Sequence, residues 1–450
     1  MNDNNKTLKN NKTFKISEGM TVSDIFNLVK TRIPPSHHKI FLEKLIYNKV
    51  DTRLDQNCLT RIQEIIKFIT DNNIDAIFVS EKSFFNQLCL AKRLKDVGKN
   101  SISISLDGAQ PHLENSYFLA SYELTLIEFI YLISLTSSLI FSQGWLFRYH
   151  QLVFIDILKG KNTHYVDFMD LNTFLFDEVP EKVITLIKKV WGEDAVENNL
   201  LQKWCEKELC RTAEKCFFPG SESHVSALGL DRSEIKKSLL VNFSINSDMF
   251  VTKTQRNEGA TKFVYAGGIP PFDERRVPEF FSDAQLIKTF TPLLKRNKNL
   301  QIDVYNNPLI MSESEYEAVY KPHFQLEKKY KGYGFYHGSD GLSIRQTLSG
   351  YCFGLMLFNF RETLFGKEHF NNLIPTKFYL YLEAGLPVIV SSEWRELSIL
   401  IEKYNAGLSV TWYPELNLEN LVKNIDKVTM SKNVLKLRDD LAKRSYIGLT

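Results

Sequence analysis

The stretch PTKFYLYLEAGLPVI, residues 375–389, decides the fold because it joins a helix to a buried strand through one glycine. Pro375 suits the first turn of a helix and Gly385 suits its end, while the apolar run that follows is typical of a strand. Amides at the helix start, with Lys377 beside them, would attract an anion, and the expected ligand is a diphosphate. The same pattern also suits an ordinary amphipathic helix without a ligand.

Strands and helices alternate around this stretch. Short β-rich runs separated by helical periodicity predict an α/β fold with a parallel, doubly wound sheet. Glycine and polar residues follow several of these runs, at the sheet edge where such folds bind ligands. The predicted strands are KFVYAGG (262–268), LQIDVYNN (300–307), GYGFYHGS (332–339), GLMLFNF (354–360) and LPVIVSS (386–392).

The N-terminal half contains a second α/β pattern. A helical period over residues 59–73 precedes the strand IDAIFVS (74–80), a further helix ends near Gly98, and SISISLDG (101–108) is the next strand. This order predicts a βαβ unit with parallel strands and a right-handed crossover. Residues 142–213 show helical patterns without a clear strand, so no topology is predicted there.

Length and composition predict two domains. The chain has 450 residues, 44% of them hydrophobic, which is enough for more than one core. We expect a disordered lead over residues 1–15, a first domain over 16–250 and a second over 251–428. Residues 429–450 form a helical end that could pack back over the first domain. The formal net charge of only +3 argues against nucleic-acid binding.

Cysteines and aspartates give no sign of a metal site. The cysteines lack metal-binding spacing, so they indicate reduced thiols in a cytoplasmic protein. The aspartates of the second half are isolated rather than clustered, so a bound divalent ion is not expected. The six cysteines are Cys58, Cys89, Cys205, Cys210, Cys216 and Cys352.

One apolar stretch raises the question of a membrane. Residues 124–141, LTLIEFIYLISLTSSLIF, are nearly long enough to span a bilayer. Glu128 lies within them, and a carboxylate in lipid is costly, so we expect a buried helix running into a strand. Peripheral association with the inner face of a membrane stays open.

The motif P-x-K-x-x-x-Y-L-x-x-G-x-P-V-I, with FVYAGG and YHGS upstream, resembles the donor-binding domain of GT-B glycosyltransferases of the group 1 type. The resemblance covers residues 262–412 with good order and spacing. It implies two Rossmann-like domains whose parallel sheets face a central cleft, with the acceptor on the first domain. It also implies a nucleotide-sugar co-substrate and no separate cofactor.

The resemblance also implies a set of donor-binding residues. The base would lie near the loop after GYGFY, and the diphosphate near the start of the 375–385 helix. These residues are Gly267, Gly268, Tyr336, His337, Gly338, Asn372, Pro375, Thr376 and Lys377. Retaining members of the family often carry two glutamates seven residues apart, the second of them five residues before the glycine of G-x-P-V. In this sequence Leu380 stands at that second position, and Asn372 stands eight residues earlier. Both the donor and the stereochemistry are therefore open.

Three candidate catalytic residues come from two predicted loops. Asp107 and His112 follow a predicted strand of the first domain and would supply the general base of an inverting reaction. Glu362 could supply a first carboxylate after GLMLFNF. Each also suits a plain turn or a solvated charge. Glu383 is expected to face solvent.

The sequence favours a metal-independent glycosyltransferase of the hexosyltransferase class. Its donor would be a nucleotide-diphosphate sugar, and its acceptor a glycan, a lipid-linked saccharide or a protein. Two alternatives stay open: a sugar-nucleotide epimerase on the same fold, and a glycosyltransferase-like module that binds without turnover.

Overall fold

The computed structural model describes residues 15–46, 52–80, 85–106, 117–176, 181–219, 228–230, 239–241, 243–251, 261–269, 286–307, 311–339, 341–360 and 366–445. Contacts divide the chain into two compact units, each made of separate pieces. The first comprises Met1–Leu171, Glu197–Phe217 and Leu230–Leu239. The second comprises Asn172–Val196, Phe218–Gly229 and Leu240–Thr450, so two early pieces join the C-terminal half.

The first unit is built on a sheet in the order β3-β2-β1-β4-β5-β6-β7. The pairs β1 with β2, β1 with β4, and β4 with β5 are parallel, which confirms the predicted βαβ unit. The strands are β1 (Ile74–Ser80), β2 (Asn100–Leu106), β3 (Ala120–Leu124), β4 (Leu139–Gly144), β5 (Thr163–Phe168), β6 (Lys215–Phe218) and β7 (Leu239–Val241).

Helices cover this sheet, and the predicted helix-to-strand segment is among them. Glu128 lies in the first turn of α5 (Leu126–Leu135), where it forms a capping box with Thr125 and an ion pair with Arg61. These partners explain how a carboxylate is buried in so apolar a helix. The other helices are α1 (Val22–Val29), α2 (His38–Leu45), α3 (Gln56–Asp71), α4 (Phe85–Asp96), α6 (Tyr149–Leu158) and α9 (Ala195–Thr212). No helix of the described chain is long and apolar enough to cross a membrane.

The second unit is a doubly wound sheet in the order β10-β9-β8-β11-β12-β13, and its strand pairs are parallel. All five predicted strands are present, and β13 was not predicted. The strands are β8 (Lys262–Ala266), β9 (Gln301–Tyr305), β10 (Tyr333–Tyr336), β11 (Phe353–Met356), β12 (Val388–Ser391) and β13 (Gly407–Val410).

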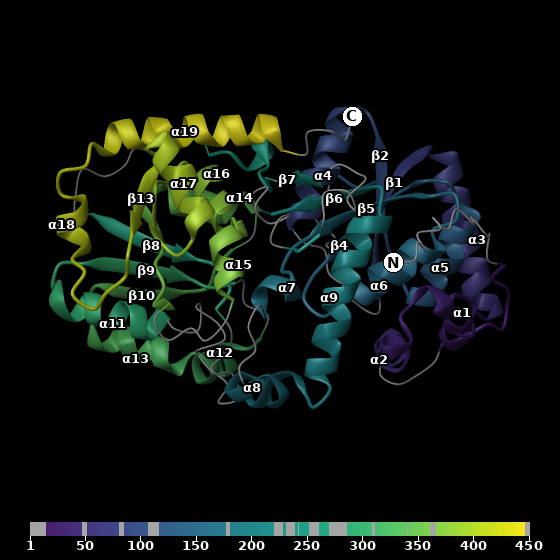
Figure 1. Cartoon of the computed structure of the whole chain (residues 1–450). Coiled ribbons are helices and arrows are strands. Elements are labelled where there is room, and N and C mark those ends of the chain that lie inside the picture. The colour runs from purple at the N-terminus through teal and green to yellow at the C-terminus, as the bar shows by residue number, and fades with distance from the viewer. Residues whose placement is uncertain are drawn as a thin grey trace, which may run out of the picture. The chain divides into compact units, whose positions relative to one another are not determined.

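Helices lie on both faces of this second sheet, with α14, α16 and α17 on one face and α11 and α13 on the other (Figure 1). Two of the earlier pieces, α7 (Asn172–Leu175) and α8 (Glu181–Trp191), also belong to this unit. The remaining helices are α11 (Leu286–Arg296), α12 (Glu313–Val319), α13 (Lys321–Lys329), α14 (Gly341–Ser349), α15 (Lys367–Asn372), α16 (Thr376–Glu383), α17 (Arg395–Tyr404), α18 (Leu418–Val422) and α19 (Lys427–Arg444).

The C-terminal helix α19 packs on the second unit. Its apolar residues Val434, Leu437 and Leu441 are fully buried in the core of that unit, beside α16 and α17. The sequence left open whether this helix packs back over the first domain. Its apolar face adds to the helical layer of the sheet that precedes it in the chain, and packing against the first domain stays a prediction.

Tyr381 anchors α16 to the sheet. Its hydroxyl accepts a hydrogen bond from the Ala266 amide at 2.8 Å and lies 3.2 Å from the Leu355 carbonyl, to which it donates. Its ring lies against Gly354, where a Cβ atom would stand 2.8 Å from the ring. The helix is therefore held over β8 and β11 by one buried side chain.

Glu383 is buried, so the expectation that it faces solvent is wrong. Packing of α14 and α19 against α16 covers the side of the helix that carries it. Its carboxylate lies 2.6 Å from Nη2 of Arg345 and accepts a hydrogen bond from the Asn246 amide at 2.8 Å. Burial raises the pKa of Glu383 to about 7, and Arg345 opposes this only in part.

We predict that Glu383→Gln destabilises the second unit at pH 8, where the wild-type carboxylate is ionised. The substitution removes the negative charge that lies 2.6 Å from the buried Arg345 guanidinium, and breaking a buried ion pair from one side costs about 3 to 5 kcal/mol. Urea unfolding at pH 8 measures the loss. As a control, Glu415→Gln removes an exposed ion pair with Arg296 and should change the unfolding midpoint little. Equal midpoints for both variants would contradict the prediction.

Candidate functional site

The glycine turn after β8 and the start of α16 are in contact. Gly267 has φ 153°, and a Cβ atom there would overlap the side chain of Lys377. The Lys377 ammonium lies 5.4 Å from the ring centre of Tyr265 and 5.9 Å from that of Phe358. Two motifs more than a hundred residues apart in sequence therefore share one edge of the sheet. The glycine is required because the lysine stem occupies the space of a side chain.

The start of α16 combines helix amides with a lysine side chain. The sequence predicted Pro375 in the first turn of the helix. In the structure the helix begins at Thr376, and Pro375 is its N-cap. Pro375 provides no side-chain cap to the helix. The first amides of a helix carry partial positive charge, and of those in α16 the Phe378 amide donates to the Pro375 carbonyl at 3.0 Å. With the ammonium of Lys377 close by, this end of α16 favours an anion.

The second side of the site is the end of β9. The amide of Ile269, just beyond the glycine turn, donates to Oδ1 of Asn306 at 2.8 Å. A Cβ atom on Gly268 would stand 2.8 Å from Nδ2 of Asn307. The Ile269 carbonyl accepts a hydrogen bond from the Tyr320 hydroxyl at 2.8 Å. The glycine turn is thus held by neighbours on the adjacent strand and its following helix.

The third side is the loop after β10. Gly338 passes so close to the Asn306 carbonyl that any side chain would clash with it. Nε2 of His337 lies 3.1 Å from the Glu313 carboxylate, and its ring is 4.1 Å from the ring of Tyr316. Nδ1 of His337 has no hydrogen-bond partner among the described residues.

Two further predicted residues lie at the edges of this arrangement. The ring of Tyr336 is 43% exposed and stacks on Tyr305 at 5.1 Å between ring centres. Asn372 is on α15, where its side chain donates to the carbonyl of Glu368 at 2.7 Å. The structure therefore brings the glycine turn, the α16 start and the His337 loop together. Asn372 is bonded within its own helix.

The three predicted catalytic residues lie outside the described residues. Asp107 and His112 fall in the gap that follows β2, and Glu362 falls in the gap before α15. Their roles remain predictions.

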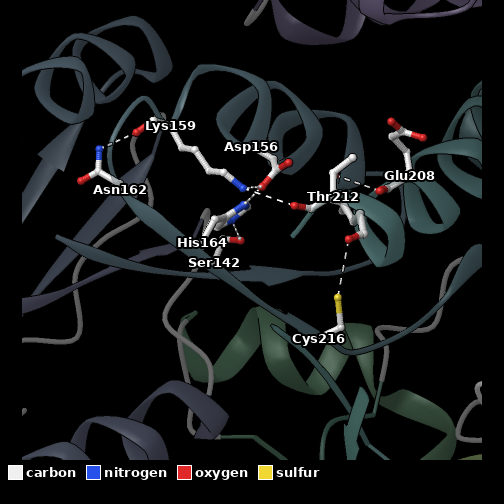
Figure 2. Close-up of polar contacts among 9 residues, drawn as sticks. Ser142, Asp156, Lys159, Asn162, His164, Glu208, Thr212 and Cys216 are labelled. Atoms are coloured by element: carbon white, nitrogen blue, oxygen red, sulfur yellow. Dashed lines mark hydrogen bonds and ion pairs between the residues drawn. The ribbon is translucent and has the colours of Figure 1, made fainter. Parts of the chain in front are cut away.

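A second polar cluster, in the first unit, was not found from the sequence (Figure 2). Oγ of Ser142 on β4 lies 2.6 Å from Nε2 of His164 on β5, and Nδ1 of His164 lies 2.8 Å from Asp156 on α6. Lys159 also donates to Asp156, at 2.7 Å. The distances match those of a Ser-His-Asp catalytic triad.

Burial makes this cluster structural rather than catalytic. Ser142 is 1% exposed, His164 0% and Asp156 7%. Burial lowers the pKa of His164, and the hydrogen bond to Asp156 opposes this in part. Burial alone would raise the pKa of Asp156, but His164 and Lys159 hold it below its usual range. A neutral histidine between a hydroxyl donor and a carboxylate ties β4, β5 and α6 together.

The cysteines and the acidic residues give no sign of a metal site in the described part of the chain. The six cysteines are all free, and four of them are buried. Within the described ranges, no group of three or more His, Cys, Asp and Glu residues could hold a metal ion. Metal independence of the reaction remains a prediction.

Comparisons with known proteins find likeness in structure. No family model matches the chain, and no curated protein matches it by sequence. Sucrose-phosphate synthase from Thermosynechococcus elongatus superposes with a TM-score of 0.52 at 14% identity, over 82% of this chain and 94% of that one.

Two other structures match at lower TM-scores. Os79 from O. sativa, in complex with UDP and deoxynivalenol-3-glucoside, has a TM-score of 0.46 at 9% identity, over 82% of this chain and 95% of its own. The UDP-GlcNAc 2-epimerase from Neisseria meningitidis, bound to UDP-GlcNAc, has a TM-score of 0.40 at 12% identity, over 82% and 98%.

The chain has a GT-B-like fold of two Rossmann-like domains, as the motif resemblance implied. Its structure is glycosyltransferase-like. A fold of this kind does not by itself assign an activity, because activity depends on the residues of the site.

We predict that Ser142→Ala lowers stability and that Ser142 is unreactive. The substitution leaves Nε2 of His164 buried without its donor, which costs about 1 to 3 kcal/mol. Urea unfolding measures the loss, and a fluorophosphonate probe followed by mass spectrometry tests the reactivity. Ser101→Ala is the matched control, because the buried Ser101 hydroxyl has no partner among the described residues. Covalent labelling of Ser142 would contradict a structural role.

Proposed function

We propose that this protein is a glycosyltransferase that moves a sugar from a nucleotide-diphosphate sugar to a glycan, lipid-linked or protein acceptor. The observation that carries the proposal is the contact between the glycine turn at Gly267 and the start of α16 at Lys377, within a GT-B-like fold. A turn without side chains next to a helix start and a lysine suits a diphosphate group.

The proposed donor would lie along the carboxyl edge of the second sheet. Its diphosphate would contact the amides of the first turn of α16 and the ammonium of Lys377. The aromatic rings of Tyr265 and Phe358 lie 5.4 and 5.9 Å from that ammonium and form an apolar side of its surroundings. A charge pair in such surroundings is stronger than one in bulk water. The base would lie toward the loop that contains His337, on the far side of Asn306.

The chemistry follows from where charge develops. As the bond from the anomeric carbon to the diphosphate breaks, negative charge grows on the leaving phosphate oxygen. Lys377 and the α16 dipole stabilise that charge more in the transition state than in the ground state, which is the requirement for catalysis. Asp107, His112 or Glu362 would supply the carboxylate or base that assists the acceptor hydroxyl.

The glutamate that the resemblance leads one to expect on α16 is absent from this sequence. Leu380 is half-buried on α16 at the position where the family's ribose-binding carboxylate is expected. Glu383, one turn later, is held by Arg345 and the Asn246 amide. Recognition of the donor sugar would therefore depend on other side chains.

We predict that Lys377→Met weakens nucleoside-diphosphate binding about 10- to 100-fold, because a charge-assisted contact with the diphosphate is lost. Methionine keeps an apolar stem over Gly267, so the turn stays packed. A thermal-shift titration with UDP, GDP, TDP and ADP measures the effect, since a ligand of the folded state raises the melting temperature. The control Lys403→Ala removes an exposed lysine near the far end of α17 and should leave the shift unchanged. Wild-type shifts in Lys377→Met would overturn the diphosphate assignment.

The activity itself is tested by product analysis. We expect slow release of nucleoside diphosphate and free sugar when the protein is incubated with UDP-, GDP- and TDP-sugars without an acceptor, because water replaces the acceptor. Chromatography with mass detection identifies the products. Interconversion of two nucleotide-sugars would instead support an epimerase, and binding without any product would support a module without turnover.

A further inference from the structure

Asn306 is bonded to the glycine turn, to α12 and to the end of β10. It lies directly after β9 and is 5% exposed. Its Oδ1 accepts hydrogen bonds from the amides of Ile269 and Asn307, both at 2.8 Å. Its Nδ2 donates to the Tyr316 hydroxyl at 3.1 Å. Its backbone amide donates to the Tyr336 carbonyl at 3.0 Å.

These bonds connect the two ends of the proposed nucleotide site. Ile269 belongs to the glycine turn, where the diphosphate would lie. The Tyr316 ring is 4.1 Å from the ring of His337, where the base would lie. The carbonyl of Asn306 is also the atom that excludes a side chain from Gly338. One buried side chain therefore sets the distance between the two loops.

We propose that Asn306 is a positioning residue that holds the glycine turn and the His337 loop at the separation that a nucleoside diphosphate spans. The inference rests on the proposed function, since it names which residue pre-organises that same site. Asparagine suits the role because its amide is both an acceptor and a donor. The carboxamide accepts from the Ile269 amide beyond β8 and at the same time donates to the Tyr316 hydroxyl on α12, beside His337. A ligand that touches both loops benefits from this fixed spacing, because no binding energy is spent in bringing them together.

The test separates positioning from general stability by comparing two probes. Pyrophosphate reaches only the diphosphate end, whereas a nucleoside diphosphate reaches both ends. Calorimetry on the full chain gives the dissociation constant of each probe. The nucleoside diphosphate is the tightest binder among UDP, GDP, TDP and ADP, and its dissociation constant is divided by that of pyrophosphate. In Asn306→Ala the nucleoside diphosphate should lose at least about tenfold more affinity than pyrophosphate does, because misplaced contacts are costly.

Two further variants sharpen the experiment. Tyr316→Phe removes only the acceptor of Nδ2, so it should weaken nucleoside-diphosphate binding by about 2- to 10-fold and leave pyrophosphate binding unchanged. It carries the test if Asn306→Ala does not fold. Asn297→Ala is the matched control, because Asn297 is 5% exposed in the same unit and its side chain donates to the Leu293 carbonyl. That variant should leave both dissociation constants unchanged.

The outcomes distinguish failure of the proposed function from failure of the positioning role. A wild-type chain that binds none of the four nucleotides overturns the proposed function and this inference with it. A wild-type chain that binds, with an unchanged ratio in folded Asn306→Ala or in Tyr316→Phe, overturns the positioning role alone. A selective loss of nucleoside-diphosphate affinity in Asn306→Ala and Tyr316→Phe, with Asn297→Ala unaffected, supports it.

Discussion

The hydroxyl of Tyr381 is the contact on which the candidate site depends. It bonds the last amide of β8 at Ala266 and a carbonyl of β11 at Leu355, so α16 cannot shift along the sheet without breaking a buried hydrogen bond. The residue after Ala266 is Gly267, and the first turn of α16 carries Lys377. Fixing one end of the helix to the strand therefore fixes the other end to the glycine turn.

Buried polar groups give both units their specific arrangement. In the second unit, Glu383 and Arg345 pair under the helical layer. In the first, Ser142, His164 and Asp156 connect two strands and a helix. The cost of burying each of these polar groups is offset only if its partner lies at hydrogen-bonding distance. Each group is therefore compatible with few alternative packings. Triad-like distances arise from this requirement alone, and burial separates such a framework from a catalytic site.

Local pattern was sufficient for the strands that are rich in apolar, β-branched and aromatic residues and for the glycine-bounded helices. The runs at β1 and β8 to β12 and the end of α16 at Gly385 were predicted because neighbouring residues determine them. The strand β5 was missed because His164 and Asp167 interrupt its apolar pattern, and their partners come from other elements. The short edge strand β13 is half-exposed and carries little signal. Glu383 was misjudged because α14 and α19, which bury it, are distant in sequence.

The sequence by itself determined the class of fold and the motif residues, Gly267, His337 and Lys377, since periodicity and spacing are properties of the chain alone. Only the tertiary structure decided that these residues meet at one sheet edge and that Asn306, which no motif marks, joins them. It also decided that the Ser142 cluster is sealed from solvent. The physical reason is that hydrogen-bond partners and burial depend on which distant segments pack together, and a linear pattern does not contain that information.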